Sequence, residues 1–417
     1  MRRITRRRRL VLASLLAALG AMLYAASASA AWTHYFSLVK AEGVGAPRVA
    51  VAPNGSAAFS WERSGGLQTR VRNPDGTLSP IQAIAPPETF RGFESTDLAV
   101  DSDGNAFYVW PVGLDGRYVR ARVRHANGTL GPVQTLATSP GDLDAGLRNV
   151  RVGVDGTGRA VFSWIRTKGA GTPVLQARVR SATGGLGPVV DIGSGAGYSQ
   201  LTVTPGGRAL FAWESHMGIL GRAMSAAGSV GPLQQVSTST HAIDPHVVAA
   251  GSRILFSWRQ ETGDDASIMA RELSGGSLTP PDVIASGGLL SSIWPTVAIA
   301  PDGRAAFCWY APNPVGRVRS PSGALGPVET ITPDGDCVLD MDASGNVVFG
   351  ATVATGGKKR ALARTQPAGG ALGPMQLLSP PGYNASFTLV DVNAAGDAAA
   401  VWTEGQRGFA IQAAFGP

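Results

Sequence analysis

The sequence predicts an all-β protein, an eight-bladed β-propeller made of four-stranded antiparallel blades. The first observation is a repeat: the pattern VRVGVDGTGRAVFSW at 150–164, with two alternating apolar residues, a glycine turn and small–x–Phe–x–Trp, recurs eight times. The copies end at Trp61, Trp110, Trp164, Trp213, Trp258, Trp309, Ala351 and Trp402. The second is the spacing between these ends, 42 to 54 residues, because strand-rich repeats of this length are typical of propellers. The third is composition, since 55 glycines and 28 prolines supply the many turns that short strands need.

Each repeat predicts the same inner hairpin. Val152 and Val154 alternate with small residues, as expected of a strand in the crowded innermost position. A Gly-bearing turn follows, and the next strand carries Phe162 and Trp164 two positions apart. That spacing places both rings on one face of the sheet. We therefore expect these aromatic pairs to pack between neighbouring blades and not to bind a ligand.

The outer half of each repeat contains an arginine and a Leu-Gly-Pro motif. Arginines recur in register in the third strand, at Arg70, Arg122, Arg178, Arg222, Arg271, Arg317 and Arg364. Such a ring could recognise carboxylates, but its position away from the axis favours a structural role, with the stems over aromatic rings and the charged heads in water. A motif such as Leu130-Gly131-Pro132 then opens the fourth strand, where proline suits an edge position.

The two ends of the chain predict how the ring closes. The last repeat stops at Phe415-Gly416-Pro417, where a fourth strand should begin. Near the start, Tyr35-Phe36-Ser37-Leu38 is similar to the fourth strand Val133-Gln134-Thr135-Leu136. We therefore expect the N-terminal strand to complete the last blade, which also removes an exposed sheet edge.

The first 30 residues predict a cleaved signal peptide, followed by a single propeller domain over 31–417. An Arg-rich start leads into an apolar stretch at 10–23 and the small-x-small site Ala28-Ser29-Ala30. The apolar stretch is short for a bilayer span, so an uncleaved anchor is the lesser alternative. We expect a secreted, extracellular or cell-surface protein with no membrane span after cleavage, exported by either the general secretory or the twin-arginine route.

The positive charge of the chain is concentrated in this leader. Six arginines lie there, and removing them from the net charge of +7 leaves +1 for the rest. A nucleic-acid partner is therefore not expected, because binding to phosphates needs a basic surface. The two cysteines, Cys308 and Cys337, end one repeat's second strand and open the next repeat's first strand. A disulfide and a role as small core residues remain equally supported.

Candidate binding residues lie where the repeats differ, because variable loops on a regular scaffold carry specificity. Exposed aromatic residues are expected on the variable loops at Phe93, Tyr198, Trp294 and Tyr383. Charged residues follow the tryptophan positions near the axis at Glu62, Glu214, Arg259 and Glu404. Aromatic rings beside scattered charges suit a glycan, a cell-surface polymer or a protein, bound by a monomer.

No catalytic residue, metal site or cofactor is predicted. His241 and His246 flank one loop without the spacing of a ligand pair, and the stretch Asp101-Ser102-Asp103-Gly104-Asn105 lacks the later carboxylate of a calcium loop. Neither a Gly-rich phosphate loop nor a Gly-x-Ser-x-Gly elbow occurs in the sequence.

The motifs Gly-x-Ala-x-Phe-x-Trp and Leu-Gly-Pro over residues 32–417 resemble secreted bacterial β-propeller repeat proteins, loosely sialidase-like or WD-repeat-like. The sialidase Asp-box and the tryptophan motif of quinoprotein dehydrogenases are not matched. The resemblance implies a non-catalytic binding or scaffold propeller. The main alternative is a glycan-acting hydrolase or lyase of sialidase-like type, which needs two carboxylates roughly 5–10 Å apart, such as Glu62, Glu214 or Glu404. A redox propeller with a bound quinone is the third reading.

Overall fold

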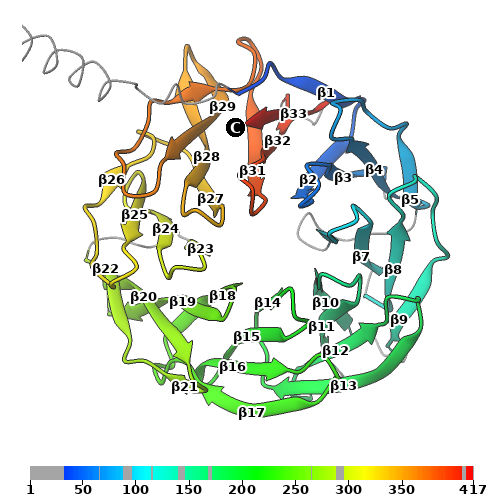
Figure 1. Ribbon diagram of the computed structural model, residues 1–417, viewed down its shortest axis with the longest axis vertical. Coiled ribbons are helices and arrows are strands. Elements are labelled where there is room, and N and C mark those ends of the chain that lie inside the picture. The colour runs from blue at the N-terminus through cyan, green and yellow to red at the C-terminus, as the bar shows by residue number, and fades with distance from the viewer. Residues whose placement is uncertain are drawn as a thin grey trace, which may run out of the picture.

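The computed structural model is a closed ring of eight antiparallel β-sheets arranged around a central axis (Figure 1). It describes residues 32–64, 66–87, 96–113, 116–139, 146–167, 171–263, 265–287, 295–405 and 410–416. These residues form strands, turns and loops, with no helix among them. The predicted eight-bladed propeller is therefore confirmed.

Each of blades 1 to 4 has four strands, numbered from the axis outward. Blade 1 contains β2 (Val44–Val51), β3 (Ala57–Arg63), β4 (Gly66–Arg72) and β5 (Gln82–Ala85). Blade 2 contains β6 (Asp97–Val100), β7 (Ala106–Val112), β8 (Tyr118–Arg124) and β9 (Gln134–Thr138). Blade 3 contains β10 (Gly146–Val154), β11 (Ala160–Thr167), β12 (Val174–Arg180) and β13 (Leu186–Ser194). Blade 4 contains β14 (Ser199–Val203), β15 (Ala209–Ser215), β16 (Gly218–Met224) and β17 (Val230–Gln235).

Blades 5 to 8 follow the same order, with two irregularities. Blade 5 contains β18 (Ala242–Ala250), β19 (Arg253–Thr262), β20 (Asp265–Ser274) and β22 (Asp282–Ser286), and the short β21 (Ser277–Leu278) also pairs with β20. Blade 6 contains β23 (Thr296–Ile299), β24 (Ala305–Tyr310), β25 (Pro314–Arg319) and β26 (Glu329–Thr330). Blade 7 contains β27 (Cys337–Met341), β28 (Val347–Thr355), β29 (Lys358–Gln366) and β30 (Gln376–Leu377). Blade 8 contains β31 (Ala385–Val392), β32 (Ala398–Glu404), β33 (Ala410–Gly416) and, outermost, β1 (Phe36–Lys40).

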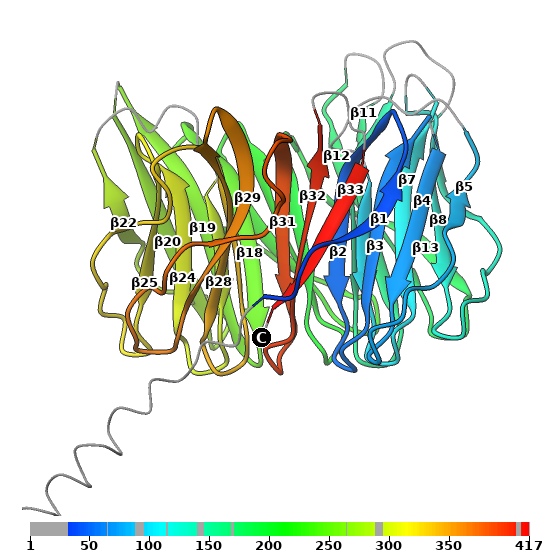
Figure 2. The same ribbon diagram turned by 90° about the horizontal axis from the view of Figure 1, so that it is seen from above.

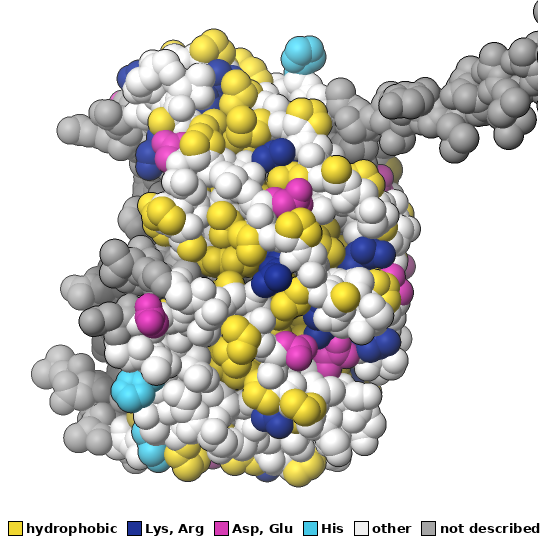
Figure 3. Space-filling model, turned by 90° about the vertical axis from the view of Figure 1, so that its left-hand side faces the viewer, with side chains coloured by type: hydrophobic (Ala, Val, Ile, Leu, Met, Phe, Trp, Pro, Cys, Tyr) yellow, Lys and Arg dark blue, Asp and Glu magenta, His cyan; other side chains and the backbone are white. Residues whose placement is uncertain are grey.

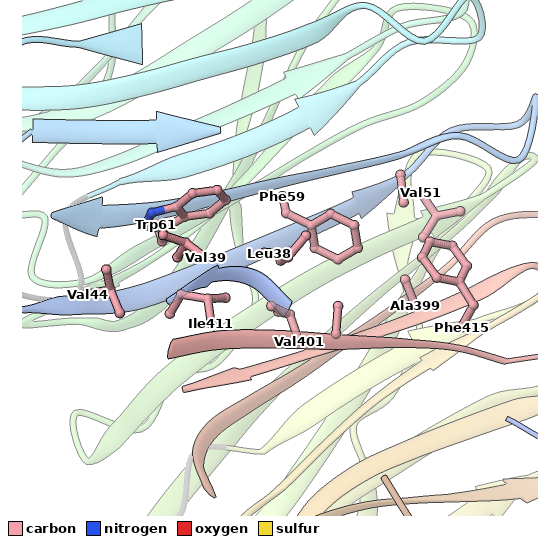
Figure 4. Close-up of a cluster of buried hydrophobic side chains, with 12 residues drawn as sticks. Leu38, Val39, Val44, Val51, Phe59, Trp61, Ala399, Val401, Ile411 and Phe415 are labelled. Carbon is pink, nitrogen blue, oxygen red and sulfur yellow. The ribbon is translucent and has the colours of Figure 1, made fainter. Parts of the chain in front are cut away.

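The N-terminal strand closes the ring, as predicted. β1 pairs antiparallel with β33, and the two ends of the chain meet in blade 8 (Figure 1). The strand extends to Lys40, two residues beyond the predicted Leu38. Leu38 is fully buried and lies in one hydrophobic cluster with Phe59 of blade 1 and Phe415 of β33 (Figure 4). The closing strand therefore contributes core side chains as well as main-chain pairing.

The ring has two different faces (Figure 2). Short hairpins that join the first and second strands of each blade lie on one face, here called the turn face. The opposite face, here called the variable face, receives the loops that lead into each innermost strand. The turn-face hairpins are locked by side chains: Asp101 Oδ1 accepts hydrogen bonds from the N–H groups of Asp103 and Asn105. The stretch with the composition of a calcium loop is thus a hairpin turn.

The repeated aromatic residues form the core between blades, as predicted. Trp61, Trp110, Trp164, Trp213, Trp258 and Trp402 are all less than 2 % exposed. Each lies in a cluster with residues of a neighbouring blade, such as Trp164 with Val109 and Val119 of blade 2. Burial of such large apolar side chains is the main stabilising contribution of the blade contacts.

Seven arginines, here called the staple arginines, tie successive blades together. In each, Nε donates to a main-chain carbonyl of its own blade and Nη1 donates to a carbonyl of the preceding blade's outermost strand. They are Arg70, Arg122, Arg178, Arg222, Arg271, Arg317 and Arg364. The structural role is confirmed, and the half-buried heads bind main-chain carbonyls in addition to contacting water. In blade 8 the equivalent position is Ala414, which pairs with Ala400.

A disulfide joins Cys308 of blade 6 to Cys337 of blade 7, with Cα atoms 6.3 Å apart. It links the second strand of one blade to the first strand of the next.

The outer side of blades 5 to 7 mixes apolar side chains with isolated charges of both signs (Figure 3). Val283 in β22, and Val328 and Met375 directly before β26 and β30, are each half exposed.

Candidate binding site at the axis

Eight residues at one register of the innermost strands surround the axis, one from each blade. Each pairs with the second-strand residue that immediately precedes the tryptophan position. This axial ring consists of Arg48, Asp97, Arg151, Gln200, His246, Thr296, Val338 and Leu389. All eight residues are half-buried. Blades 1 to 6 contribute polar residues, and blades 7 and 8 contribute apolar ones.

β-Bulges precede four members of this ring. The register of the innermost strand shifts just before Arg48, Arg151, His246 and Leu389. Three bulge residues have positive φ although they are not glycine: Ala46 (47°), Asn149 (52°) and Asp244 (53°). Non-glycine residues in this region cost about 1–2 kcal/mol, and bulges redirect the side chains that follow them. The same feature therefore recurs in blades 1, 3 and 5, just before Arg48, Arg151 and His246.

Arg48 and Arg151 flank Asp97 across three consecutive blades. Nη1 of each arginine donates to the carbonyl of the residue before it, Pro47 at 3.1 Å and Val150 at 2.9 Å, so both guanidinium groups are held alike. Asp97 Oδ2 accepts from the N–H of Val152 at 2.9 Å. Burial raises the pKa of Asp97, while the charge of Arg151 opposes that rise. Burial also lowers the pKa of Arg48.

Tyr198 and Gln200 of blade 4 hold the Arg151 side chain. Arg151 Nη2 donates to the Tyr198 hydroxyl at 2.8 Å, and its guanidinium carbon lies 5.4 Å from the centre of the tyrosine ring. Arg151 Nε donates to Gln200 Oε1 at 3.4 Å, and Gln200 Nε2 donates to the Tyr198 hydroxyl at 2.9 Å. Tyr198, predicted as a binding residue, is therefore part of the arginine's support.

Two further groups near Arg48 and Arg151 have shifted pKa values. Burial raises the pKa of Glu62 to about 7, and the charge of Arg48 opposes the shift. Glu62 Oε1 is buried without a hydrogen-bond partner among the described residues. Burial, helped by the charge of Arg151, lowers the pKa of His246 to about 4. At neutral pH His246 is therefore uncharged, and Glu62, with a pKa of about 7, is only partly ionised.

Glu214 and Arg259 converge on the bulge residue Asp244. Glu214 Oε1 accepts from the Asp244 N–H at 2.8 Å, and Arg259 Nε donates to Asp244 Oδ2 at 3.1 Å. Burial raises the pKa values of both Glu214 and Asp244. These two predicted residues thus fix the bulge of blade 5 at the variable face.

Among the described residues, Glu404 and Tyr383 do not join this network. Glu404 Oε2 accepts from Gln412 Nε2 of β33 at 2.5 Å, and Gln412 also binds Ser37 of β1, so Glu404 supports the closure of blade 8. Tyr383 precedes β31 and is 58 % exposed. Trp294 and Phe93 lie outside the described residues.

The sequence reasoning missed a carboxyl pair at the next register of the axis. Asp340 Oδ2 accepts from Val392 N–H at 2.8 Å, and Asp391 Oδ2 accepts from Val51 N–H at 2.6 Å, which links blades 7, 8 and 1. The two carboxyl groups also share a hydrogen bond. Burial and the neighbouring Asp391 raise the pKa of Asp340, and burial raises that of Asp391 to about 6. The signal was present, because these positions hold small residues such as Ala50 and Ala99 in other repeats.

Within the described ranges, no three His, Cys, Asp or Glu side chains are placed to hold a metal ion. The same part of the chain has no helix that is long and apolar enough to cross a bilayer.

Comparison with known proteins bears out the architecture. No protein-family model and no curated protein matches the sequence. The fold is similar to the BP39L lectin from Burkholderia pseudomallei, with a TM-score of 0.59 and 9 % identity over 82 % of this chain and 99 % of the lectin. It is also similar to the Dos1 propeller (TM-score 0.58, 10 % identity, 93 % and 95 % coverage). The WD40 domain of SCAP from fission yeast gives 0.56 at 12 % identity, with 92 % and 94 % coverage.

Two peptidases are matched over only part of their length. The chain spans 55 % of a prolyl endopeptidase and 62 % of a puromycin-hydrolyzing peptidase from Mycobacterium tuberculosis. Every one of these structures is 13 % identical or less. The likeness therefore establishes a β-propeller fold, which hosts many unrelated functions.

Proposed function

We propose that this chain is an exported, non-catalytic binding or scaffold propeller that recognises a glycan, a cell-surface polymer or a protein at the variable-face end of its axis. The observation that carries the proposal is the pair Arg48 and Arg151, held alike behind strained bulges and partly exposed to solvent. Their guanidinium groups favour a ligand with carboxylate or other anionic groups. Lectin and WD40 propellers among the structural neighbours are consistent with a binding role.

A glycan-acting hydrolase or lyase is the second candidate, because carboxyl groups occur at the axis. Asp340 and Asp391, however, share a hydrogen bond. That places them much closer than the roughly 5–10 Å between the carboxyl groups of glycosidases. Glu214 and Glu404 are each engaged in a structural hydrogen bond. The arrangement therefore favours binding over turnover.

Screening the purified mature protein against an array of glycans and surface polymers tests the proposal. Arg151→Gln should weaken binding of any hit roughly tenfold, as expected for loss of a charged contact of about 1.4 kcal/mol. Arg148→Gln, on the same strand but exposed, is the matched control and should bind normally. Tyr383→Ala should also weaken binding while leaving the melting temperature nearly unchanged.

Two outcomes would overturn this function. Equal binding by Arg151→Gln and the wild type would show that the ligand binds elsewhere than at the axis. Turnover of a glycoside that disappears in a Glu62, Glu214 or Glu404 variant would establish the hydrolase. Export is tested separately by intact mass: cleavage after Ala30 predicts a mature protein that begins at Ala31, whereas a retained Arg-rich leader would indicate an anchor.

A further inference from the structure

A second candidate site lies on the turn face, away from the axial ring. It is a cleft of about 320 Å³ between blades 6 and 7. Leu325 and Pro327 of blade 6 and Val347 and Gln366 of blade 7 line it, together with Arg304. This volume is at the lower end of the range found for small-molecule sites.

The cleft lies beside Gln366, whose side chain is shorter than the arginine found at the same position in several other blades. The third strand of each blade has one residue that faces the preceding blade. It lies two positions after the staple arginine or, in blade 8, two positions after Ala414, and we call it the seam residue. The eight seam residues are Arg72, Arg124, Arg180, Met224, Leu273, Arg319, Gln366 and Gly416. Long side chains fill most of these seams. The two described clefts lie beside Gln366 and beside Leu273, where the second measures about 150 Å³.

Other seams show what normally fills this space. Arg124 Nε donates to Gln82 Oε1 at 2.7 Å, and Arg180 Nε donates to Gln134 Oε1 at 3.0 Å. Between blades 6 and 7 the shorter Gln366 makes the corresponding contact, with Nε2 donating to Glu329 Oε2 at 3.2 Å. The amide thus preserves the bond across the seam while leaving out the volume of a guanidinium group.

The cleft offers a donor and an acceptor that the protein does not use itself. Arg304 Nε has no hydrogen-bond partner among the described residues, and the Arg304 side chain is 17 % exposed. Asp302 Oδ2 lies 4.0 Å from Nε, within the range of an ion pair but too far for a hydrogen bond. An unused buried donor on a charged group is costly, so a bound acceptor would stabilise it. Gln366 Oε1 accepts no hydrogen bond from the described residues.

We propose that this cleft binds a single sugar ring that bears a carboxylate, such as a uronic acid residue. The carboxylate would accept from Arg304, since charged donor–acceptor pairs are the strong hydrogen bonds. A ring hydroxyl would donate to Gln366 Oε1. The apolar C–H face of the sugar would lie against Leu325, Pro327 and Val347. The site is independent of the proposed axial site, which lies at the opposite face.

Calorimetric titration of the full mature protein with D-glucuronate tests this proposal, with D-glucose and acetate as the comparison ligands. Glucuronate should bind measurably more tightly than either, because glucose lacks the carboxylate and acetate lacks the ring. Gln366→Arg should restore the usual seam residue, fill the cleft and weaken glucuronate binding roughly tenfold or more. Arg304→Gln should have a similar effect without filling the cleft, so the proposal stays testable if one variant fails to fold.

Arg253→Gln is the matched control for Arg304→Gln. Arg253 holds the same position one blade earlier and lies against Gly303 as Arg304 lies against Gly345. This control should bind glucuronate like the wild type. Equal binding of glucose or acetate, or normal glucuronate binding by Gln366→Arg, would overturn the proposal. Glucuronate binding that is lost in Arg151→Gln but kept in Gln366→Arg would assign the sugar to the axis and would equally overturn it.

Discussion

Arg70 of blade 1 donates from Nη1 to the main-chain carbonyl of Leu38 at 3.1 Å and from Nε to that of Ser79 at 2.8 Å. Leu38 belongs to β1, so this side chain ties the first blade to the strand that completes the last one. The same pair of bonds occurs between the other stapled blades, whereas blade 8 has Ala414 instead. Trp32 lies there against Gly416 and belongs to the cluster that contains Ala414.

We expect Arg70→Met to lower the free energy of unfolding by about 1.5–3 kcal/mol, because a hydrogen-bonded charged group is lost while its apolar stem is kept. Thermal and urea unfolding measure the effect. Arg63→Met is the control, since Arg63 is exposed at the end of β3. Equal stability of the two variants would mean that the staple does not contribute.

Deleting residues 32–40 should cause aggregation or loss of cooperative unfolding. The deletion leaves the edge of β33 unpaired and removes Leu38 and Phe36 from the cluster around Phe415. Light scattering and differential scanning calorimetry report both effects. A truncated protein that melts like the full one would show that the ring closes without β1.

Reduction of the disulfide between Cys308 and Cys337 should lower the melting temperature. The two residues are separated by 29 positions, and a loop of that size corresponds to about 3–4 kcal/mol in the chain-entropy model. The double variant Cys308→Ala and Cys337→Ala should match the reduced protein. Free thiols found by titration of denatured, non-reduced protein would contradict the bond.

The carboxyl pair predicts a stability that falls as pH rises. Asp391 has a pKa of about 6 in the folded protein, above the usual 3.8, so the folded state keeps a proton that the unfolded state has lost. This contribution is complete below about pH 4 and is lost as pH rises through about 6. Its main-chain donor is Val51, and the facing charge is Asp340. Asp391→Asn should remove the effect.

Titration of His246 changes the free energy of unfolding with pH in the opposite direction, so the experiment must separate the two contributions. Its pKa is lowered to about 4 from 6.5, so its contribution is present above about pH 6.5 and is lost as pH falls through about 4. The difference between wild type and Asp391→Asn, measured by urea unfolding from pH 4 to 8, isolates the carboxyl pair. A difference that does not change with pH would contradict the shared proton.

Binding of an anionic ligand at the axis should weaken as pH rises through about 7. Glu62 ionises there and adds a negative charge close to Arg48. Glu62→Gln should remove this dependence, and the expected change is in Kd, not in the melting temperature. Glu404→Gln is the comparison, because Glu404 lies with Gln412 and away from the axial network.

Much of the fold could be predicted because every repeat carries the same sequence signals. The aromatic pair at Phe162 and Trp164 and the turn before it are local signals, and eight copies average out the exceptions. Closure was predictable for the same reason, since 35–38 matches a known strand position. The axial ring was not predictable in this way, because its residues differ from blade to blade and the bulges beside Ala46, Asn149 and Asp244 leave no mark in the sequence pattern.

The candidate site was therefore predicted only in part. Glu62, Glu214 and Arg259 were predicted because they follow tryptophan positions, and Tyr198 because it is an aromatic residue of a variable loop. The structure brings these four residues near Arg48, Arg151 and Asp244. Glu404 was chosen by the same rule, but it lies two residues after Trp402 instead of one, so it points to the other side of its sheet and supports β33. A one-residue shift reverses the face of a strand, which spacing alone does not resolve.

The pairing of β1 with β33 also has a consequence for the order in which the molecule can be made. Translation produces β1 first and β33 last, so the first strand must wait for a partner from the far end of the chain. Blades 1 to 7 can each pair their own strands as soon as these appear, whereas blade 8 needs both ends at once. Until blade 8 is complete, the ring stays open and its unpaired strand edges can associate with other chains. The connectivity of the ring therefore predicts a slow final step in folding. A chain that ended before β33 could form seven blades but could not close the ring.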